Sequence, residues 1–215
     1  MNIEAGSKLV MIGDSITDVD RARPVGEGLG EALGRGYVMM VDGLLAARYP
    51  ERRIRVVNMG CSGDTVRALK ARWQTDVLDQ KPDWLSILIG INDVWRQFDM
   101  PLIPEAGVPL DEYEATLDEL VAATRPGLKG LVLMTPYYIE PNPADAMRAR
   151  MDEYGAAVKR VAAKRGAILV DTQAAFEPVL KRYHPNYLAW DRVHPTHVGH
   201  MILARAFLQA VGFEG

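Results

Sequence analysis

Short apolar runs alternate along this chain with longer segments in which apolar residues recur every three or four positions. The short runs predict five strands, at residues 9–12, 54–58, 84–89, 130–134 and 167–171. The amphipathic segments predict helices at residues 37–49, 110–124 and 143–164, and a last helix that ends near residue 211. Asp64 or Thr65 is expected to cap a further helix, whose buried face should carry Leu69, Trp73, Val77 and Leu78.

The predicted strands are continuously apolar rather than alternating, as strands buried on both faces are. Strands that alternate with helices favour an α/β protein, in which a parallel sheet lies between two layers of helices. The chain has no internal repeat and no low-complexity linker. Residues 1–215 are therefore expected to form a single domain with a three-layer α/β/α fold.

Three of the predicted strands run directly into polar or glycine-rich connectors. Ser15 follows the first strand, Gly63 the second and Asn92, in a predicted loop, the third. Right-handed crossovers gather the carboxyl ends of parallel strands along one edge, where α/β proteins place their sites. We therefore expect these three residues to lie close together. Asp18 and Asp20, in the polar connector that follows Ser15, are interpreted as solvated loop residues.

Composition and charge argue against some classes of binding partner and indicate a cellular compartment. The chain has 215 residues, 48% of them hydrophobic, which suits a globular protein with a sizeable core. A net charge of −3, without a Lys/Arg cluster, argues against a nucleic-acid partner. No apolar run is long enough to span a membrane, and the first residues do not resemble a secretory signal. The single cysteine, Cys61, leaves no intrachain disulfide. We expect a cytoplasmic protein without a membrane partner.

Ser15 is a candidate nucleophile, provided that a base removes its proton. His194 is a candidate base, since the reference pKa of histidine, about 6.5, lies near neutral pH. Asp191, three residues earlier, could fix the imidazole tautomer and stabilise the imidazolium. The alternatives are structural: Ser15 as a helix N-cap, and His194 as a loop histidine before a proline.

Hydrolysis of an ester also needs donors for the oxyanion of the tetrahedral intermediate. The backbone N–H groups of Ser15 and Gly63 and the side-chain amide of Asn92 are candidates. Taken singly, Gly63 is typical of a turn, and Asn92 of a turn or a cap. Their common position at strand ends favours the functional interpretation.

Four blocks of this sequence resemble those of the SGNH hydrolases, a branch of the GDSL esterases, in the same order. They are Gly13-Asp14-Ser15-Ile16, with Ile16 where the family usually has Leu, Asn58 to Gly63, Gly90-Ile91-Asn92-Asp93, and Asp191-Arg192-Val193-His194. The resemblance implies a flavodoxin-like five-stranded sheet, a Ser15–His194–Asp191 triad and an oxyanion hole formed by Ser15, Gly63 and Asn92. It also implies a serine esterase mechanism with no cofactor and no metal.

Longer stretches, residues 90–98 and 189–195, are similar to bacterial intracellular acetylxylan esterases, which remove acetyl groups from xylo-oligosaccharides. The resemblance implies an acetylated carbohydrate substrate and a homo-oligomer. Trp95 and Trp190 are the candidate substrate-binding residues, and Tyr137 and Tyr138 are further aromatic residues expected beside the site. Because aromatic side chains also fill cores and interfaces, contact with substrate, core packing and a subunit interface all stay open.

Other functions remain as alternatives. Asp191, His194, His197 and His200 recur every three residues and could present metal ligands, as in a metal-dependent hydrolase. A sugar-binding protein without catalysis is a third class, and a lipid or thioester hydrolase is the alternative among esterases. Cys61 is interpreted as a small residue in a tight turn, and Asp14 and Asp93 as hydrogen-bond supports of their loops.

Overall fold

A five-stranded parallel sheet forms the middle layer of the protein, in a computed structural model that describes residues 1–214. The strand order is β2-β1-β3-β4-β5, as in flavodoxin-like folds. Each of the five predicted strands is confirmed, with these bounds: β1 Lys8–Gly13, β2 Arg55–Asn58, β3 Trp84–Leu88, β4 Gly130–Met134 and β5 Ile168–Val170. The predicted α/β class and three-layer architecture are confirmed as well.

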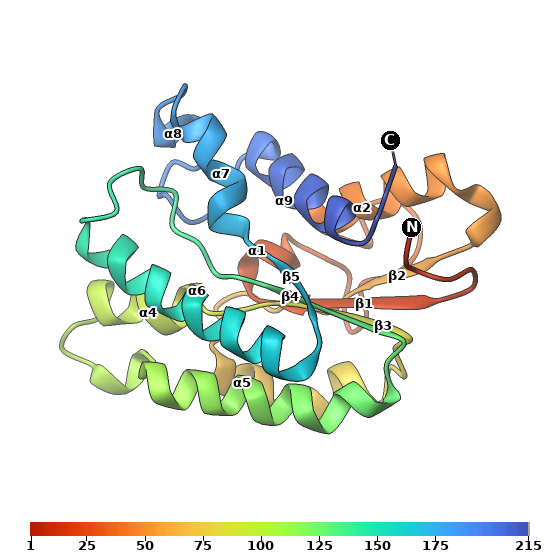
Figure 1. Ribbon diagram of the computed structural model, residues 1–215, viewed down its shortest axis with the longest axis horizontal. Coiled ribbons are helices and arrows are strands. Elements are labelled where there is room, and N and C mark those ends of the chain that lie inside the picture. The colour runs from red at the N-terminus through yellow and green to blue at the C-terminus, as the bar shows by residue number, and fades with distance from the viewer. Residues whose placement is uncertain (215) are drawn as a thin grey trace.

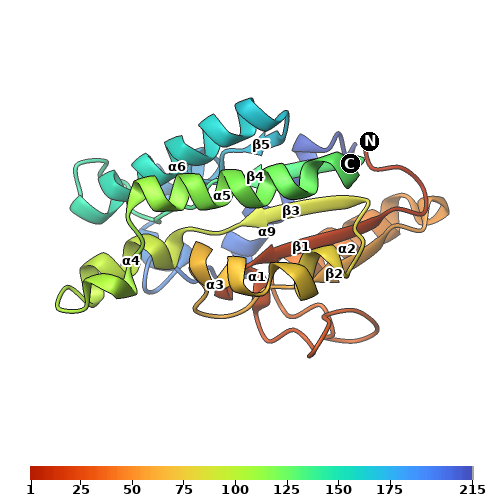
Figure 2. The ribbon, with the colours of Figure 1, turned by 90° about the horizontal axis from the view of Figure 1, so that it is seen from below.

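Helices cover both faces of the sheet (Figure 1). One layer contains α2, α7 and α9, and the other contains α3, α4, α5 and α6. Figure 2 shows α5 and α6 lying side by side across the sheet, where they form one of the largest helix–helix contacts. The α-helices are α1 Ser15–Asp18, α2 Tyr37–Arg48, α3 Val66–Ala71, α4 Ile91–Asp99, α5 Leu110–Thr124, α6 Ala146–Arg165, α7 Thr172–Leu180, α8 Pro185–Leu188 and α9 His197–Ala210.

The central strands are buried because both of their faces are covered. Every residue of β3 and β4 is buried, and Leu9 to Ile12 of β1 are fully inaccessible. Each fully buried aliphatic side chain contributes about 1.5–3 kcal/mol relative to its exposed state. The sheet is therefore a rigid platform, and the connectors at its carboxyl edge are anchored on it.

Several sequence predictions about individual elements need correction. Residues 90–93 were expected to be a loop, but α4 begins at Ile91, so Asn92 lies in the first turn of a helix. Residues 172–180, for which the sequence pattern predicts no element, form the helix α7, which includes Pro178. Leu78 is 37% exposed, whereas Val77 is fully buried. Both residues lie in the π-helical turn Gln74–Leu78, which directs Val77 toward the core and leaves Leu78 at the surface.

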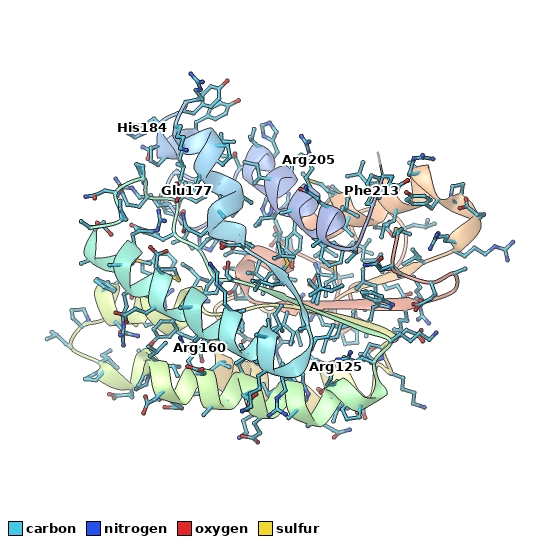
Figure 3. All side chains as sticks on the ribbon, in the orientation of Figure 1. Arg125, Arg160, Glu177, His184, Arg205 and Phe213 are labelled. Atoms are coloured by element: carbon cyan, nitrogen blue, oxygen red, sulfur yellow. The ribbon has the colours of Figure 1, made fainter. Side chains whose placement is uncertain are left out.

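Short helical turns complete the connectors. They are η1 Pro50–Arg52, η3 Pro104–Ala106 and η4 Arg125–Gly127, with a π-helical turn, η2, at Gln74–Leu78. The side chains of Figure 3 show His184 at the end of the molecule where α7 meets α8. Within residues 1–214, no helix has the length and apolar content needed to cross a membrane.

Candidate active site

Ser15 lies at the carboxyl end of β1, at the start of α1. The turn before it is tight: a Cβ on Gly13 would lie 2.2 Å from the carbonyl oxygen of Leu88. Asp14 is the N-cap of α1, and its Oδ1 accepts a hydrogen bond of 3.0 Å from the N–H of Ile16. Asp14, rather than Ser15, therefore caps the helix, which leaves the Ser15 hydroxyl for other contacts.

The hydroxyl of Ser15 contacts His194, which lies 179 positions later in the sequence. Ser15 Oγ is 2.9 Å from His194 Nε2, and His194 Nδ1 is 2.6 Å from Asp191 Oδ2. The three side chains thus form one hydrogen-bonded line, with the imidazole in the middle. This is the arrangement that a serine needs in order to transfer its proton to a base that a carboxylate orients.

Hydrogen bonds to both oxygens hold the Asp191 carboxylate in place. Oδ2 faces the imidazole, while Oδ1 accepts the backbone N–H groups of Val193 at 3.0 Å and His194 at 2.8 Å. Burial by itself would raise the pKa of Asp191, but the hydrogen bonds from His194 and from the two backbone N–H groups outweigh it and lower the pKa. Asp191 is therefore ionised at neutral pH and attracts an imidazolium.

The segment after β4 holds the loop that carries Asp191 and His194. Ile139 N–H donates to the carbonyl of Arg192 at 2.9 Å, and Tyr137 Oη donates to the carbonyl of Val193 at 3.2 Å. The Arg192 guanidinium forms an ion pair with the buried carboxylate of Glu140. Arg192 has φ +64°, a left-handed conformation that costs an L-residue about 1–2 kcal/mol. These contacts stabilise that backbone.

Gly63 and Asn92 lie on the two neighbouring connectors. Gly63 has φ +87°, which favours glycine, and is exposed in the loop after β2. Asn92 is buried, and its Nδ2 donates to the carbonyl of Asp64 at 2.9 Å. This bond connects the Asn92 side chain to the residue that follows Gly63. Both residues thus belong to one hydrogen-bonded edge of the sheet.

Two buried carboxyl groups lie beneath these loops. Burial raises the pKa of Asp14 to about 8, against the opposing hydrogen bond from Ile16 N–H, and the Asp93 carboxylate raises it further. Burial likewise raises the pKa of Asp93 to about 7, although its Oδ1 accepts the N–H of Val66 at 2.9 Å. Their backbone hydrogen bonds are those expected of loop supports. Asp14 is largely neutral at pH 7, which reduces the negative charge next to Ser15.

Sequence reasoning missed two residues that support the site. Asp18 was interpreted as solvated, but it is 4% exposed and accepts the N–H of Ser62 at 2.9 Å and Arg23 Nη2 at 2.6 Å. Asp20, by contrast, is exposed. Arg72 was not singled out: its guanidinium donates to Asp64 Oδ2 at 2.5 Å and to the carbonyl of Gly13 at 2.9 Å. A lone arginine on a short amphipathic segment gives no sequence signal for such a role.

The four aromatic residues named from the sequence differ in their surroundings. Trp95 lies beside His194, with ring centroids 5.8 Å apart. Trp190 is 77% exposed and directly precedes Asp191. Tyr137 is fully buried against Phe176, so it is a core residue, and Tyr138 is half-buried. Trp95 and Trp190 both have solvent-accessible surface next to the candidate triad. They therefore remain the candidate substrate-binding residues.

The metal-site hypothesis is not supported by the placement of the later histidines. His197 and His200 belong to α9, where His200 is buried and its Nδ1 accepts the N–H of Tyr37 at 3.3 Å. In the part of the chain that the structure describes, no three His, Cys, Asp or Glu side chains are grouped as metal ligands would be. Cys61 lies in a turn, where its N–H donates to the carbonyl of Gly13 at 2.9 Å.

Comparison with known proteins gives full-length matches. The sequence model of the GDSL-like Lipase/Acylhydrolase family matches residues 11–202. An acetylxylan esterase from Geobacillus stearothermophilus is 63% identical over 214 residues, which is 100% of this chain and 98% of that protein. LAE5, a solved alpha/beta hydrolase enzyme from the metagenome of Lake Arreo in Spain, is 58% identical, with a TM-score of 0.98 over 99% of this chain and 98% of its own.

The crystal structure of Axe2, an acetylxylan esterase from Geobacillus stearothermophilus, has a TM-score of 0.98 and 63% identity, over 100% of this chain and 98% of Axe2. Three crystal structures of catalytic mutants of Axe2 carry the substitutions S15A, D191A and H194A. The resemblance that the four sequence blocks indicate is thereby confirmed. This chain belongs to the GDSL-like lipase/acylhydrolase family, and it is a hydrolase with the SGNH α/β fold.

Proposed function

We propose that this protein is a serine esterase that removes acetyl groups from acetylated xylo-oligosaccharides or related acetylated sugars. The observation that carries the proposal is the line Ser15 Oγ, His194 and Asp191, with contacts of 2.9 and 2.6 Å. The acetylxylan esterase activity of the full-length relative supports the substrate class. The catalytic substitutions named for Axe2 support the three residues of the triad.

In the first half of the reaction, Ser15 Oγ attacks the acetyl carbonyl while His194 Nε2 takes its proton. The tetrahedral oxyanion accepts hydrogen bonds from the N–H groups of Ser15 and Gly63 and from the Asn92 amide. As the intermediate collapses, the imidazolium returns the proton to the sugar oxygen, which leaves as an alcohol. Asp191 stays ionised and stabilises the transient imidazolium.

In the second half, His194 removes a proton from water, and the resulting hydroxide attacks the acetyl group on Ser15. The same donors bind the second oxyanion. Collapse of the second intermediate returns the imidazole proton to Ser15 Oγ and releases acetic acid, which loses its own proton to solvent and leaves as acetate. The residues of the chain supply every proton transfer in this cycle, so the proposed mechanism needs no cofactor and no metal.

Acetate release from acetylated xylo-oligosaccharide, compared with hydrolysis of p-nitrophenyl esters of increasing chain length, tests the substrate class. We expect acetate release and a steep preference for acetyl over octanoyl esters. Preference for the long chain would indicate a lipid hydrolase, and preference for an acetyl thioester would indicate a thioesterase. If the wild type cleaves p-nitrophenyl acetate but releases no acetate from the sugar, the esterase chemistry stands and the substrate class is wrong.

Trp95 and Trp190 are the proposed substrate-facing aromatic residues. Trp95 flanks the imidazole, and an aromatic face suits the apolar face of a sugar ring. Trp190 has most of its surface exposed, which also fits an interface between copies of the chain. We propose a homo-oligomer on this ground. Sedimentation velocity of the wild type and of Trp190→Ala tests it, and a monomeric wild type would contradict it.

We also propose that residues 1–215 act as one domain in the cytoplasm. One core cluster connects all five strands with the helices on both faces, which supports a single cooperative unit. Cys61 is a half-buried free thiol next to the site, and a reducing compartment preserves such a group. A single thermal unfolding transition and fractionation of the native host's cells test the two statements.

A further inference from the structure

The Asn92 side chain can serve an oxyanion in only one orientation. Its nitrogen end donates hydrogen bonds, whereas its oxygen end would repel a developing negative charge. The two ends of an amide have nearly the same shape, so the neighbouring groups must select the orientation. Two neighbours, one at each end of the amide, make this selection in the structure.

Arg96 contacts the oxygen end. Its Nη2 donates to Asn92 Oδ1 at 3.2 Å, one turn along α4. The guanidinium is itself held in place: it forms an ion pair with Asp99 and stacks over the ring of Trp95, at 4.6 Å from the ring centroid. A guanidinium has hydrogen-bond donors and no acceptor. Only the oxygen end of the amide can therefore form a hydrogen bond with it.

The Asp64 carbonyl contacts the nitrogen end, since it accepts a hydrogen bond from Asn92 Nδ2 at 2.9 Å. Arg72 anchors Asp64 through its carboxylate, at 2.5 Å, and also binds the carbonyl of Gly13. This bond from Asn92 uses one of the two hydrogens on Nδ2. Among residues 1–214, Asn92 Nδ2 donates no second hydrogen bond, which leaves its other N–H for the substrate.

We infer that Arg96 is a positioning residue of the reaction: it orients the Asn92 amide so that a free N–H faces the developing oxyanion. This inference rests on the proposed function, in which Asn92 is an oxyanion donor. The positive charge of Arg96 on the amide oxygen also polarises the amide and strengthens its N–H as a donor. The effect is largest in the transition state, where the charge on the substrate oxygen is highest.

Kinetics of Arg96→Gln with p-nitrophenyl acetate tests the inference on a substrate too small to depend on sugar contacts. We expect kcat to fall about tenfold with KM nearly unchanged, less than the ~100-fold or greater loss on removing a donor itself. Affinity for a trifluoromethyl ketone, which forms an oxyanion when Ser15 adds to it, should fall by a similar factor. Arg96→Lys, which keeps the charge and loses the planar fork, should lie between Arg96→Gln and the wild type.

Arg160→Gln is the matched control, because it removes an arginine from an exposed ion pair, with Glu114 of α5, that makes no contact with Asn92 or Arg96. It should keep wild-type kcat. In an Asn92→Ala background, Arg96→Gln should cause no further loss, since it acts through the amide. Thermal unfolding of each variant identifies any general loss of structure.

Three results would overturn the inference: wild-type kcat in Arg96→Gln, a loss of kcat without loss of ketone affinity, or an equal loss in the Asn92→Ala background. Failure of the proposed function gives a different result. In that case Asn92→Ala alone would keep wild-type kcat. That result would show that Asn92 is not an oxyanion donor, whatever the kinetics of the Arg96 variants.

Discussion

The ring of Trp95 packs edge-on against the imidazole of His194, with centroids 5.8 Å apart and an interplanar angle of 62°. Trp95 is half-buried and lies on α4, the helix that also carries Asn92 in its first turn. One helix therefore supplies both a proposed oxyanion donor and a wall beside the proposed base. The open part of that wall is where a sugar attached to the acetyl group can contact the protein.

Trp95→Ala is expected to lower kcat/KM for acetylated xylo-oligosaccharide about tenfold, mainly through KM, since an aromatic contact contributes about 0.5–1.5 kcal/mol. Hydrolysis of p-nitrophenyl acetate should change far less. Steady-state kinetics with both substrates makes the comparison. Phe98→Ala, at an exposed position on the same helix, is the control. Equal losses on the two substrates would instead indicate that Trp95 acts through its neighbours His194 or Arg96.

Asp191→Asn is expected to keep the fold and lose about 10⁴-fold in kcat, because a neutral amide no longer favours the required tautomer of His194. In the wild type the hydrogen bonds to Asp191 lower its pKa, so Asp191 stays ionised on mild acidification and continues to orient the imidazole. The pH–rate profile and circular dichroism of both proteins test this. A variant with near-normal kcat would demote Asp191 to a structural residue.

Asp14→Asn is expected to flatten the pH dependence of stability. The folded protein holds this proton up to a pKa of about 8, whereas the unfolded chain releases it near the ordinary value of 3.8. Between these values the folded state binds more protons, so the free energy of unfolding falls as pH rises, on the order of a few kcal/mol. Urea unfolding at pH 4.5, 6 and 8 measures the slope.

The amide that Asp14→Asn introduces cannot titrate, and its oxygen can still accept the N–H of Ile16. Between pH 4.5 and 8 the variant should therefore lose less stability than the wild type does. Asp20→Asn is the control, since the Asp20 side chain is 74% exposed. An unchanged slope in Asp14→Asn would show that Asp14 is ionised in the folded protein.

The pair of Glu140 and Arg192 is expected to stabilise the loop that carries the triad. The Glu140 side chain is 10% exposed and that of Arg192 is 37% exposed, so solvent screens the pair only partly. A double-mutant cycle of Glu140→Gln and Arg192→Gln should give a coupling of about 1–2 kcal/mol in the free energy of unfolding. Each single variant should also lose kcat, because the loop positions Asp191 and His194.

The surface pair of Arg160 and Glu114 provides the comparison for that cycle. Figure 3 labels Arg160 on α6, and its side chain is 55% exposed. Its coupling should be below about 1 kcal/mol, with kcat unchanged. A coupling near zero for Glu140 and Arg192, with wild-type kcat in both single variants, would exclude a role in positioning the loop.

The fold could be predicted from the sequence because its main signal is local. Each strand contains a short apolar run, such as Leu131 to Met134, and each connector with a candidate residue follows a strand directly. The parallel order then brings Ser15 and Asn92 to adjacent strands without further information. The pairing of Ser15 with His194 could be anticipated because few residue types can act as a base near neutral pH.

The supporting contacts could not be predicted, because they depend on distances between segments far apart in the chain. Asp18 contacts Ser62, 44 positions away, and Arg72 binds Gly13, 59 positions away. Both are polar residues on short segments, where the pattern equally favours a solvated position. Burial of Asp18 follows from the packing of the end of α1 against the loop that contains Ser62, which no periodicity encodes.

Covalent labelling at Ser15 tests the central claim most directly. A p-nitrophenyl phosphonate should transfer its phosphonyl group to Ser15 Oγ and release p-nitrophenolate, while the serine proton leaves through His194. We predict one label per chain, located on Ser15 by mass spectrometry of peptides, with acetate release lost in proportion. Ser15→Ala, folded as the wild type, should take up no label and release no acetate. Full acetate release from a labelled wild type, or from Ser15→Ala, would contradict the account.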